Sequence, residues 1–208
     1  MHIIQYLSAF LLGYIFGCFQ TSYFLSKKYG KKDIREMGSG NAGASNVTSE
    51  MGWKFGIITG ICDILKAFIP VKLILFILPN SNQQIELMAI TGMAAILGHI
   101  YPFFMNFKGG KGIASYLGIL LAINWQIGIM AIILLSLITI ITDYVAIGSI
   151  FLYLAIPMIT FFSGNYSNIV FSCSLILLLV GIIKHLINMQ RIINGTEVGL
   201  KSVFHKNK

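Results

Sequence analysis

Long apolar runs determine what this chain can fold into. Several of them approach or reach the roughly 20 residues that a helix needs to cross a bilayer. Only 11% of the 208 residues are charged and 56% are apolar, whereas soluble domains contain about 25% charged residues. The sequence therefore argues against a soluble globular domain and predicts an all-α integral membrane protein.

The apolar runs divide the chain into seven predicted helices within a single polytopic membrane domain, residues 1–208. The N-terminus has no basic region and no small-residue cleavage site, so we expect the first run to be a retained span and not a signal peptide. The expected helices lie at about 3–24, 55–78, 86–104, 113–123, 127–142, 144–162 and 169–183.

The stretch 113–142 permits two topologies, because Asn124-Trp125-Gln126 interrupts it. If it forms two helices, 13 of the 15 Lys and Arg residues lie on one membrane face. The positive-inside rule favours this answer, which places the N-terminus outside and the C-terminus inside. The helix at about 113–123 is then too short to cross unaided. We therefore expect the loop before it to dip inward, where it is buried in protein or lines a polar cavity.

Three polar clusters interrupt the apolar background, and this topology places all of them on the cytoplasmic face. The first cluster is GSGNAGASN at 38–46, and the second is GHIYPFFMNFKGGKG at 98–112. The third cluster covers 185–197. Three separate loops would hardly collect so many Gly, Asn, His and Lys residues on one face without a shared polar cavity. We therefore expect one functional site.

The first cluster has the composition of an anion-binding loop. Its glycines allow backbone N–H groups to converge, and its small polar side chains add further donors. Gly38, Gly40 and Gly43 also match the Gly-x-Gly-x-x-Gly spacing of dinucleotide-binding loops. That motif requires a preceding strand, whereas here it follows a membrane span and a basic loop. The dinucleotide interpretation is therefore discarded, and anion binding is retained.

The second cluster contains Lys108 and Lys111 among three glycines. It fails the P-loop pattern, because glycine follows Lys111 and position 105 is not glycine. Backbone donors and two mobile ammonium groups still suit a phosphate. The alternative for this cluster alone is a basic turn that contacts lipid headgroups.

The third cluster places His185, Asn188 and Arg191 one helical turn apart, so they share a helix face. Such a face can bind a phosphate or orient a hydroxyl group. The alternative is a solvated helix end whose cations complement the helix dipole. Glu197 either neutralises the lysines or acts as a base. His99, at the end of a predicted helix, is open to a structural or a binding role.

Asp63 and Lys66 lie at i and i+3 within the second predicted helix. Charges inside a membrane are costly and are usually paired, so we favour a structural ion pair over a proton relay. Cys18, Cys62 and Cys173 lack metal-ligand spacing and are interpreted as small apolar residues in helices. We expect no metal site.

The three clusters resemble, in order and spacing, the cytoplasmic motifs of the bacterial acyl-phosphate-dependent glycerol-3-phosphate acyltransferases, the PlsY family. The matching segments are GSGNAGASN, GHIYPFFMNFKGGKGIAS and HLINMQRIINGTE, and the similarity covers essentially the whole chain. It implies transfer of a fatty acyl group from acyl phosphate to the 1-hydroxyl of glycerol 3-phosphate. The products are lysophosphatidic acid and phosphate, in the first acylation of phospholipid synthesis. It also implies no metal, nucleotide or other cofactor.

The residues and the resemblance together define a candidate site. The catalytic candidates are Ser39, His185, Asn188 and Glu197. The substrate-binding candidates are Gly38, Gly40, Asn41, Gly43, Ser45, Asn46, His99, Lys108, Gly109, Gly110, Lys111, Gly112 and Arg191. The resemblance assigns the acyl-phosphate head to the first cluster and the phosphate seats to the second. It assigns glycerol 3-phosphate to His185 and Asn188.

The resemblance also implies a cellular setting and a reaction course. The expected location is the bacterial inner membrane, with a multi-pass chain and the active site on the cytoplasmic face. The expected partners are acyl phosphate, glycerol 3-phosphate, membrane lipid and the soluble enzyme that makes acyl phosphate; nucleic acid is not expected. Because acyl phosphate is an activated donor, we expect direct attack by the hydroxyl group without an acyl-enzyme.

One position departs from the family pattern, and two alternatives to the acyltransferase stay open. The first family motif continues Asn-x-x-Arg, but this chain has Ser49 three residues after Asn46. Serine cannot supply the missing charge, so a low-activity acyltransferase-like paralogue is one alternative. A small transporter of an anionic solute is the other, since broken helices suit anions. A transporter should have polar groups from two related halves at the midplane of the membrane, whereas the polar groups of this chain are predicted to lie at one membrane face.

Overall fold

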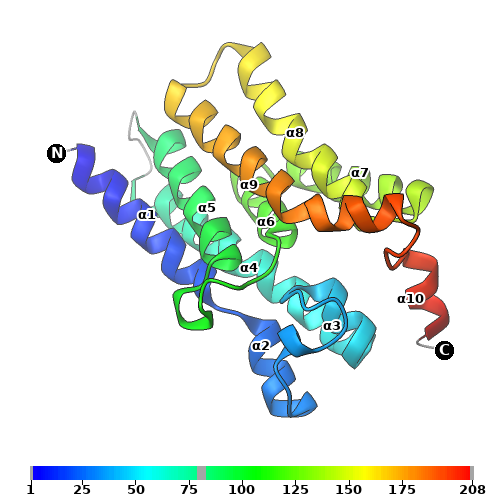
Figure 1. The fold of residues 1–208 in the computed structure, drawn as a ribbon. Coiled ribbons are helices and arrows are strands. Elements are labelled where there is room, and N and C mark those ends of the chain that lie inside the picture. The colour runs from blue at the N-terminus through cyan, green and yellow to red at the C-terminus, as the bar shows by residue number, and fades with distance from the viewer. Residues whose placement is uncertain (1, 79–82, 207–208) are drawn as a thin grey trace.

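The computed structural model describes residues 2–78 and 83–206, and this part of the chain contains helices and no β-strand. Its seven apolar helices are α1 (His2–Cys18), α4 (Trp53–Ile77), α5 (Gln84–Ile100), α6 (Ile113–Ile123), α7 (Trp125–Thr142), α8 (Val145–Ser163) and α9 (Asn168–Ile193). The described part also contains the short helices α2 (Thr21–Leu25), α3 (Ala44–Met51) and α10 (Leu200–Lys206). Figure 1 shows α2, α3 and α10 gathered at one end of the bundle, which we call the polar end.

The prediction of an all-α membrane protein is confirmed, and each of the seven expected spans corresponds to a helix. In the described residues, the segments long and apolar enough to cross a membrane are Ile3–Gly30, Gln84–Met105, Trp125–Thr142, Val145–Ser163 and Asn168–Ile193. Helix α4 is as long as these but contains several charged residues, and α6 has only 11 residues. The start of α1 and helix α10 lie at opposite ends of the bundle (Figure 1). Which end faces the cytoplasm stays a prediction.

The first predicted span is wrong in one respect: it is not continuous. Helix α1 ends at Cys18, and α2 begins at Thr21 after a break. At the break, the side chain of the buried Gln20 donates to the His99 carbonyl oxygen over 2.9 Å. Lys66 Nζ donates to the Phe19 carbonyl oxygen over 2.7 Å. Lys66 of α4 thus satisfies a carbonyl group that the broken helix leaves without a partner, and Gln20 ties the break to the end of α5.

The predicted interruption within 113–142 is confirmed. Helix α6 ends at Ile123, and the Asn124 side chain accepts hydrogen bonds from the backbone N–H groups of Gln126 and Ile127, at 2.9 and 3.2 Å. This is an N-cap, and it starts α7 in a new direction. The last predicted span was too short, because α9 continues from Asn168 to Ile193.

Small residues allow the helices to approach closely. Gly13 and Gly17 of α1 face the α5 backbone, and a Cβ atom at either position would clash with a carbonyl oxygen of α5. Gly118 of α6 approaches Ile64 of α4 in the same way. Membrane helices use such contacts because lipid offers little hydrophobic driving force for their association. The close packing holds α1 against α5 and α6 against α4.

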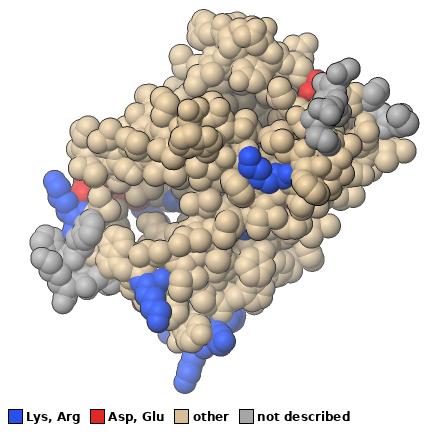
Figure 2. All heavy atoms as spheres, turned by 180° about the vertical axis from the view of Figure 1, so that it is seen from behind, with Lys and Arg blue, Asp and Glu red and all other residues tan. Residues whose placement is uncertain are grey.

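The outer surface is largely apolar. Ile141, Phe76 and Ile3 are 80% or more exposed, and similar side chains cover much of the helices. Figure 2 shows one face on which most of the described side chains are uncharged, with Lys and Arg at its lower and left edges and in its middle. An exposed apolar surface of this extent is what a lipid-facing bundle requires.

Candidate active site

The three polar clusters meet at the polar end of the bundle. Three neighbouring cavities are lined by residues that the structure describes. The largest of the three has a volume of about 490 Å³. It is lined by Gly38, Ser39, Asn41, Ser45, Asn46, Ser49, Glu50, Lys111, Asn188, Arg191, Glu197, Val198, Ser202 and Val203. Two smaller cavities, of about 200 and 210 Å³, share Asn41, Lys111 and Asn188 with it. The structure thus brings residues of all three clusters to one place.

Asn46 organises the first cluster. Its Oδ1 accepts a hydrogen bond from the Ser39 backbone N–H over 2.9 Å, and its Nδ2 donates to the carbonyl oxygens of Met37 and Ile34 over 2.9 and 3.2 Å. The side chain is buried, and these contacts occupy its amide group. Asn46 was predicted to bind substrate, but its contacts are those of a residue that shapes the loop.

Helix α3, which the sequence analysis did not predict, begins inside the first cluster at Ala44. Its first turn lies beside the large cavity, where Ser45 and Asn46 are part of the lining. The free N–H groups and the dipole at a helix N-terminus favour an anion. Gly38 and Gly40 have positive φ angles of 52° and 75°, so the loop turns back on itself before the helix starts.

The glycines of the second cluster fit against the end of α5. The Gly110 N–H donates to the His99 carbonyl oxygen over 3.1 Å, and the Gly109 N–H donates to that of Ile100 over 3.0 Å. A Cβ atom at Gly109 would clash with the His99 carbonyl oxygen, and one at Gly110 would clash with the His99 ring. This close approach brings the next residue, Lys111, to the cavity.

A chain of polar side chains connects the second and third clusters. Lys111 Nζ donates to Asn188 Oδ1 over 2.5 Å, and Asn188 Nδ2 donates to Glu197 Oε1 over 2.5 Å. Burial lowers the pKa of the Lys111 ammonium to about 8; the nearby Glu197 opposes this shift, and Arg191 adds to it. His185 lies one turn before Asn188, is buried and lines the 210 Å³ cavity.

The predicted ion pair in α4 is confirmed. Lys66 Nζ lies 2.8 Å from Asp63 Oδ1, and both side chains are buried. Asp63 also lies 3.6 Å from Nδ1 of the buried His99, and these two residues line the 210 Å³ cavity. The Ser115 hydroxyl donates to the Asp63 carbonyl oxygen over 3.0 Å. The pair therefore braces α4 against α5 and α6 directly beneath the site.

Lys108 and Ser49 differ in where they lie relative to the cavities. Lys108 is exposed and is absent from the described linings of the three cavities, so its part in phosphate binding stays a prediction. Ser49, at the position where the family resemblance expects arginine, lines the large cavity together with Arg191. The guanidinium group of this cavity therefore comes from α9 and not from α3.

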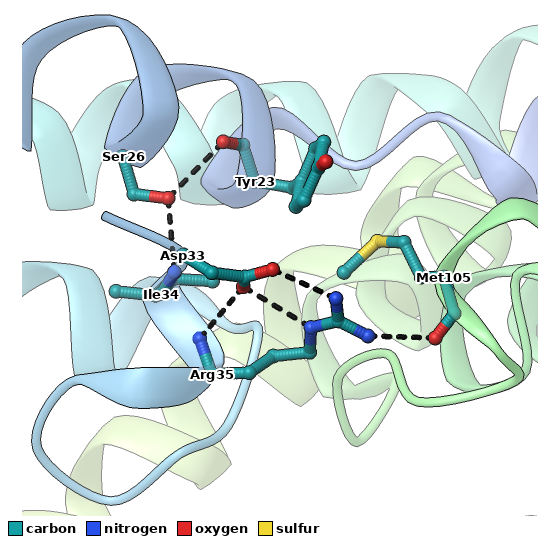
Figure 3. A network of polar contacts seen from close by, with 6 residues as sticks. All are labelled: Tyr23, Ser26, Asp33, Ile34, Arg35 and Met105. Carbon is teal, nitrogen blue, oxygen red and sulfur yellow. Dashed lines mark hydrogen bonds and ion pairs between the residues drawn. The ribbon is translucent and has the colours of Figure 1, made fainter. Parts of the chain in front are cut away.

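A network of polar contacts that was not predicted from the sequence fixes the second cluster from outside. Figure 3 shows its members, Tyr23, Ser26, Asp33, Ile34, Arg35 and Met105. Arg35 binds both carboxylate oxygens of Asp33, at 3.1 and 2.7 Å, and donates to the Met105 carbonyl oxygen over 2.7 Å. Hydrogen bonding to Arg35 lowers the pKa of the Asp33 carboxyl. The basic loop after α2 is thereby tied to the turn that precedes Gly109.

Metal ligands are not grouped in the part of the chain that the structure describes: no three His, Cys, Asp or Glu side chains lie together in a way that could hold an ion.

Comparison with known proteins gives consistent results. The family model for glycerol-3-phosphate acyltransferase matches residues 7–195. Glycerol-3-phosphate acyltransferase 1 of Oceanobacillus iheyensis is 40% identical over 208 residues, covering 98% of this chain and 99% of the relative. Glycerol-3-phosphate acyltransferase of Endomicrobium trichonymphae is 37% identical over 196 residues, covering 94% of this chain and 96% of the relative.

Crystal structures extend the likeness to three dimensions. The glycerol 3-phosphate form of PlsY, an integral membrane glycerol 3-phosphate acyltransferase, has a TM-score of 0.86 at 29% identity and covers 98% of this chain and 99% of that one. Its lysophosphatidic acid form has a TM-score of 0.80 at 29% identity, with coverages of 96% and 98%. The resemblance of the three polar clusters to the PlsY motifs is thus confirmed, and the chain belongs to the glycerol-3-phosphate acyltransferase family.

Proposed function

We propose that this acyltransferase moves a fatty acyl group from acyl phosphate to the 1-hydroxyl of glycerol 3-phosphate. The observation that supports this most directly is the Lys111–Asn188–Glu197 chain beside the N-terminus of α3. The chain joins a cation, an amide and a carboxylate within one cavity of a membrane protein. The crystal structures of PlsY with glycerol 3-phosphate and with lysophosphatidic acid, as their names state, agree with this acceptor and this product.

The proposed reaction needs positioning more than chemical activation. The hydroxyl oxygen of glycerol 3-phosphate attacks the acyl carbon, and a new ester bond forms. The bond between the acyl carbon and the phosphate oxygen breaks, and the released phosphate takes the hydroxyl proton. Because phosphate is a good leaving group, the protein has mainly to orient the reactants and to stabilise the charge on that phosphate. The products are lysophosphatidic acid and inorganic phosphate.

Residues on different sides of the cavity have different roles in the proposed reaction. Backbone N–H groups of the first cluster, with Ser39 and Ser45, would hold the phosphate of the donor. Lys111 would stabilise the charge that develops on the leaving phosphate. His185 and Asn188 would orient glycerol 3-phosphate, and Arg191 would bind its phosphate. Glu197 would act through Asn188, which it holds by a hydrogen bond.

The location of the site follows from the charge distribution. In the seven-helix arrangement, 12 of the 14 Lys and Arg residues in the described part of the chain belong to the loops and tail at the polar end or to the helix ends beside them. The positive-inside rule places such an end in the cytoplasm. We therefore place the protein in the bacterial inner membrane with its cavity facing the cytoplasm, where a soluble enzyme would supply acyl phosphate.

The test is a turnover assay with purified protein in lipid nanodiscs. Phosphate release from acyl phosphate should depend on glycerol 3-phosphate, and mass spectrometry should detect lysophosphatidic acid in equal amount. Acyl-CoA in place of acyl phosphate should give no product. Turnover with acyl-CoA alone would overturn the proposed donor. Absence of turnover with either donor, together with counterflow of labelled phosphate or glycerol 3-phosphate in liposomes, would indicate the transporter.

A second measurement tests direct attack. Rapid quenching with acyl phosphate alone, followed by peptide mass spectrometry, should find no acyl group on Ser39. A covalent acyl-Ser39 adduct that forms and decays at the rate of turnover would contradict the proposed single displacement.

A further inference from the structure

The C-terminal segment, residues 196–206, forms part of the cavity wall. The family-model match ends at residue 195, two residues before Glu197. Beyond that point, Glu197, Val198, Ser202 and Val203 all line the large cavity. The segment begins after Gly195, whose φ of 68° turns the chain away from α9. Its position across the cavity therefore depends on what holds it in place.

Hydrogen bonds hold the segment at its near end. The backbone N–H groups of Thr196 and Glu197 both donate to the carbonyl oxygen of Arg191, at 2.8 and 3.2 Å. These bonds close the end of α9, as is common where a glycine terminates a helix. They fix the direction in which the segment leaves the helix, but not where its other end lies.

Asp143 holds the far end. Its carbonyl oxygen accepts a hydrogen bond from the Leu200 N–H over 2.8 Å, and its Oδ1 accepts one from the Lys201 N–H over 2.9 Å. Both donors are in the first turn of α10, so Asp143 satisfies two N–H groups that this helix leaves without internal partners. The side chain and the backbone of one residue thus bind the segment.

The fit between Asp143 and the segment is close. A Cβ atom at Gly199 would clash with the Asp143 carboxylate, so a side chain there would push the two apart. Gly199 is buried in spite of its place near the end of the chain. Asp143 itself lies in the short turn between α7 and α8, at a φ of 69° that aspartate tolerates better than most residues. Two membrane helices therefore fix its position.

Glu197 belongs to the near anchor through its own N–H, and it lies three residues before the far anchor at Leu200. From there its Oε1 accepts the hydrogen bond from Asn188, which in turn accepts from Lys111. Displacements of about 1 Å in a catalytic site lower rates by about 100-fold, so an anchor outside the site matters to the chemistry. We propose that Asp143 is a positioning residue: by binding Leu200 and Lys201 it keeps Glu197 against Asn188. The inference rests on the proposed role of Glu197 in the acyl transfer.

The first test compares Asp143→Gly with Asp143→Asn. Glycine keeps the left-handed backbone and removes the carboxylate, whereas asparagine keeps both the backbone and a side-chain oxygen that accepts from Lys201. We expect kcat to fall about tenfold in Asp143→Gly, with KM for glycerol 3-phosphate changed less, and to stay within about twofold in Asp143→Asn. Equal kcat in both variants and the wild type would overturn the inference.

A double-mutant cycle shows whether Asp143 acts through Glu197. If it does, Asp143→Gly should cost much less activity in a Glu197→Gln background than in the wild type. Additive losses would mean that Asp143 acts by another route. A purely structural effect on the whole protein would lower the thermal unfolding temperature of both backgrounds equally and would leave the losses additive.

Gly199→Ala gives an independent check, and it also carries the test if Asp143→Gly does not fold. The added methyl group should lower kcat in the wild type, because it clashes with the carboxylate. In an Asp143→Gly or Asp143→Ser background, where the carboxylate is absent, the same substitution should have a much smaller effect. An undiminished loss there would contradict the proposed contact.

Hydrogen exchange separates this inference from the proposed function. In Asp143→Gly the amide of Lys201, which loses its acceptor, should exchange at least about tenfold faster, while the amides of α4 and α5 keep their protection. This result does not depend on turnover. An inactive wild type would refute the proposed function, and the exchange result alone would then decide whether Asp143 holds the segment. Unchanged exchange would refute the anchor even in an active enzyme.

Discussion

Two lysines near the polar end of the bundle have opposite surroundings. Lys66, in α4, lies 2.8 Å from a carboxylate and also donates to the Phe19 carbonyl oxygen. Lys111, in the loop before α6, donates to the side-chain oxygen of Asn188, a neutral amide. The nearest carboxylate in this chain of contacts, Glu197, is reached only through that amide. Both lysines are withdrawn from solvent, but only one of them has its charge neutralised by direct contact.

The difference supports a structural role for Lys66 and the proposed catalytic role for Lys111. A buried lysine paired with a carboxylate has its charge satisfied and holds helices together. A lysine that donates to a neutral amide keeps most of its electrostatic field, and that field can stabilise a bound phosphate. Lys111 lies in the wall of the cavity, and Lys66 lies behind that wall in α4. Substitutions at the two positions should therefore have different consequences.

The largest expected effect is on stability, at Lys66. Lys66→Ala leaves the buried Asp63 carboxylate without its ion-pair partner and removes the bond to Phe19. Removing one member of a buried pair costs about 3–5 kcal/mol, so we expect a large drop in the thermal unfolding temperature in detergent. Lys72→Ala, which removes an exposed lysine from the same helix, is the matched control and should change little. Equal unfolding temperatures for the two variants would contradict the structural role.

The next effect is on catalysis, at Lys111. Lys111→Ala should lower kcat about 100- to 1,000-fold, as expected for the loss of one group that stabilises transition-state charge. The unfolding temperature should stay close to that of the wild type, because Lys111 is not part of a buried ion pair. Phosphate release and thermal unfolding measured on one preparation give both values. A variant that unfolds but keeps its activity per folded molecule would reverse the assignment of the two lysines.

The pH dependence of turnover tests the charge of Lys111. Because its pKa is about 8, the ammonium group is protonated below that pH and loses its charge above it. The value of kcat/KM should therefore fall as pH rises through about 8, approaching tenfold per pH unit. Lys111→Arg keeps its charge at all these pH values. If the fall near pH 8 persists in Lys111→Arg, another group causes it.

A smaller effect is expected from adding a cation to the same cavity. Ser49→Arg places a guanidinium group on α3, opposite Arg191 of α9, and charge-assisted contacts to a phosphate should raise kcat/KM about three- to tenfold. Ser49→Gln is the uncharged control of similar length. An unchanged or lower rate in Ser49→Arg would mean that Arg191 already fills this role and that the site has been rebuilt around serine.

The smallest effect is expected at a third cation, which is paired but partly exposed. Arg35→Gln should cost about 1 kcal/mol of unfolding free energy, because solvent weakens the ion pair with Asp33. Arg35 lowers the pKa of Asp33 below its unfolded value. Its contribution is therefore present above the unfolded pKa and is lost as pH falls through the folded pKa. A loss of unfolding free energy as large as that of Lys66→Ala would show that solvent exposure does not determine how much an ion pair contributes to stability.

The helices could be predicted because their patterns are local. Apolar length gave the spans, and Asn124 marked the end of α6 correctly. The break after Cys18 left no such mark, because its contacts join residues that are distant in sequence: Lys66 donates to the Phe19 carbonyl oxygen, and Gln20 donates to that of His99. Helix α3 was missed for a different reason: its eight residues are polar and short, and the glycines before them are typical of a loop.

The site was predictable in its members and less so in their roles. Residue types and spacing identified Lys111, Asn188 and Glu197, but not the order in which they bind one another. Asn46 was assigned to substrate, whereas its amide holds the loop. Asp143 could not be found from sequence, because its partners are the backbone N–H groups of Leu200 and Lys201, and any residue provides such groups.

The short length of α6 has a consequence for how lipid and water-soluble reactants meet. Helices α6 and α7 join at Asn124, but α6 has 11 residues and α7 has 18. At about 1.5 Å per residue, the start of α6 lies about 10 Å deeper than the end of α7. The floor of the 210 Å³ cavity, which Ile113 and Ala114 line, therefore lies nearer the middle of the bundle than the end of α7 does. In the proposed reaction, a donor with a fatty chain would react there while its chain stays among the lipid tails, which spares about 0.8 kcal/mol for each methylene. The small, charged acceptor would then have to move from water to the floor of the cavity.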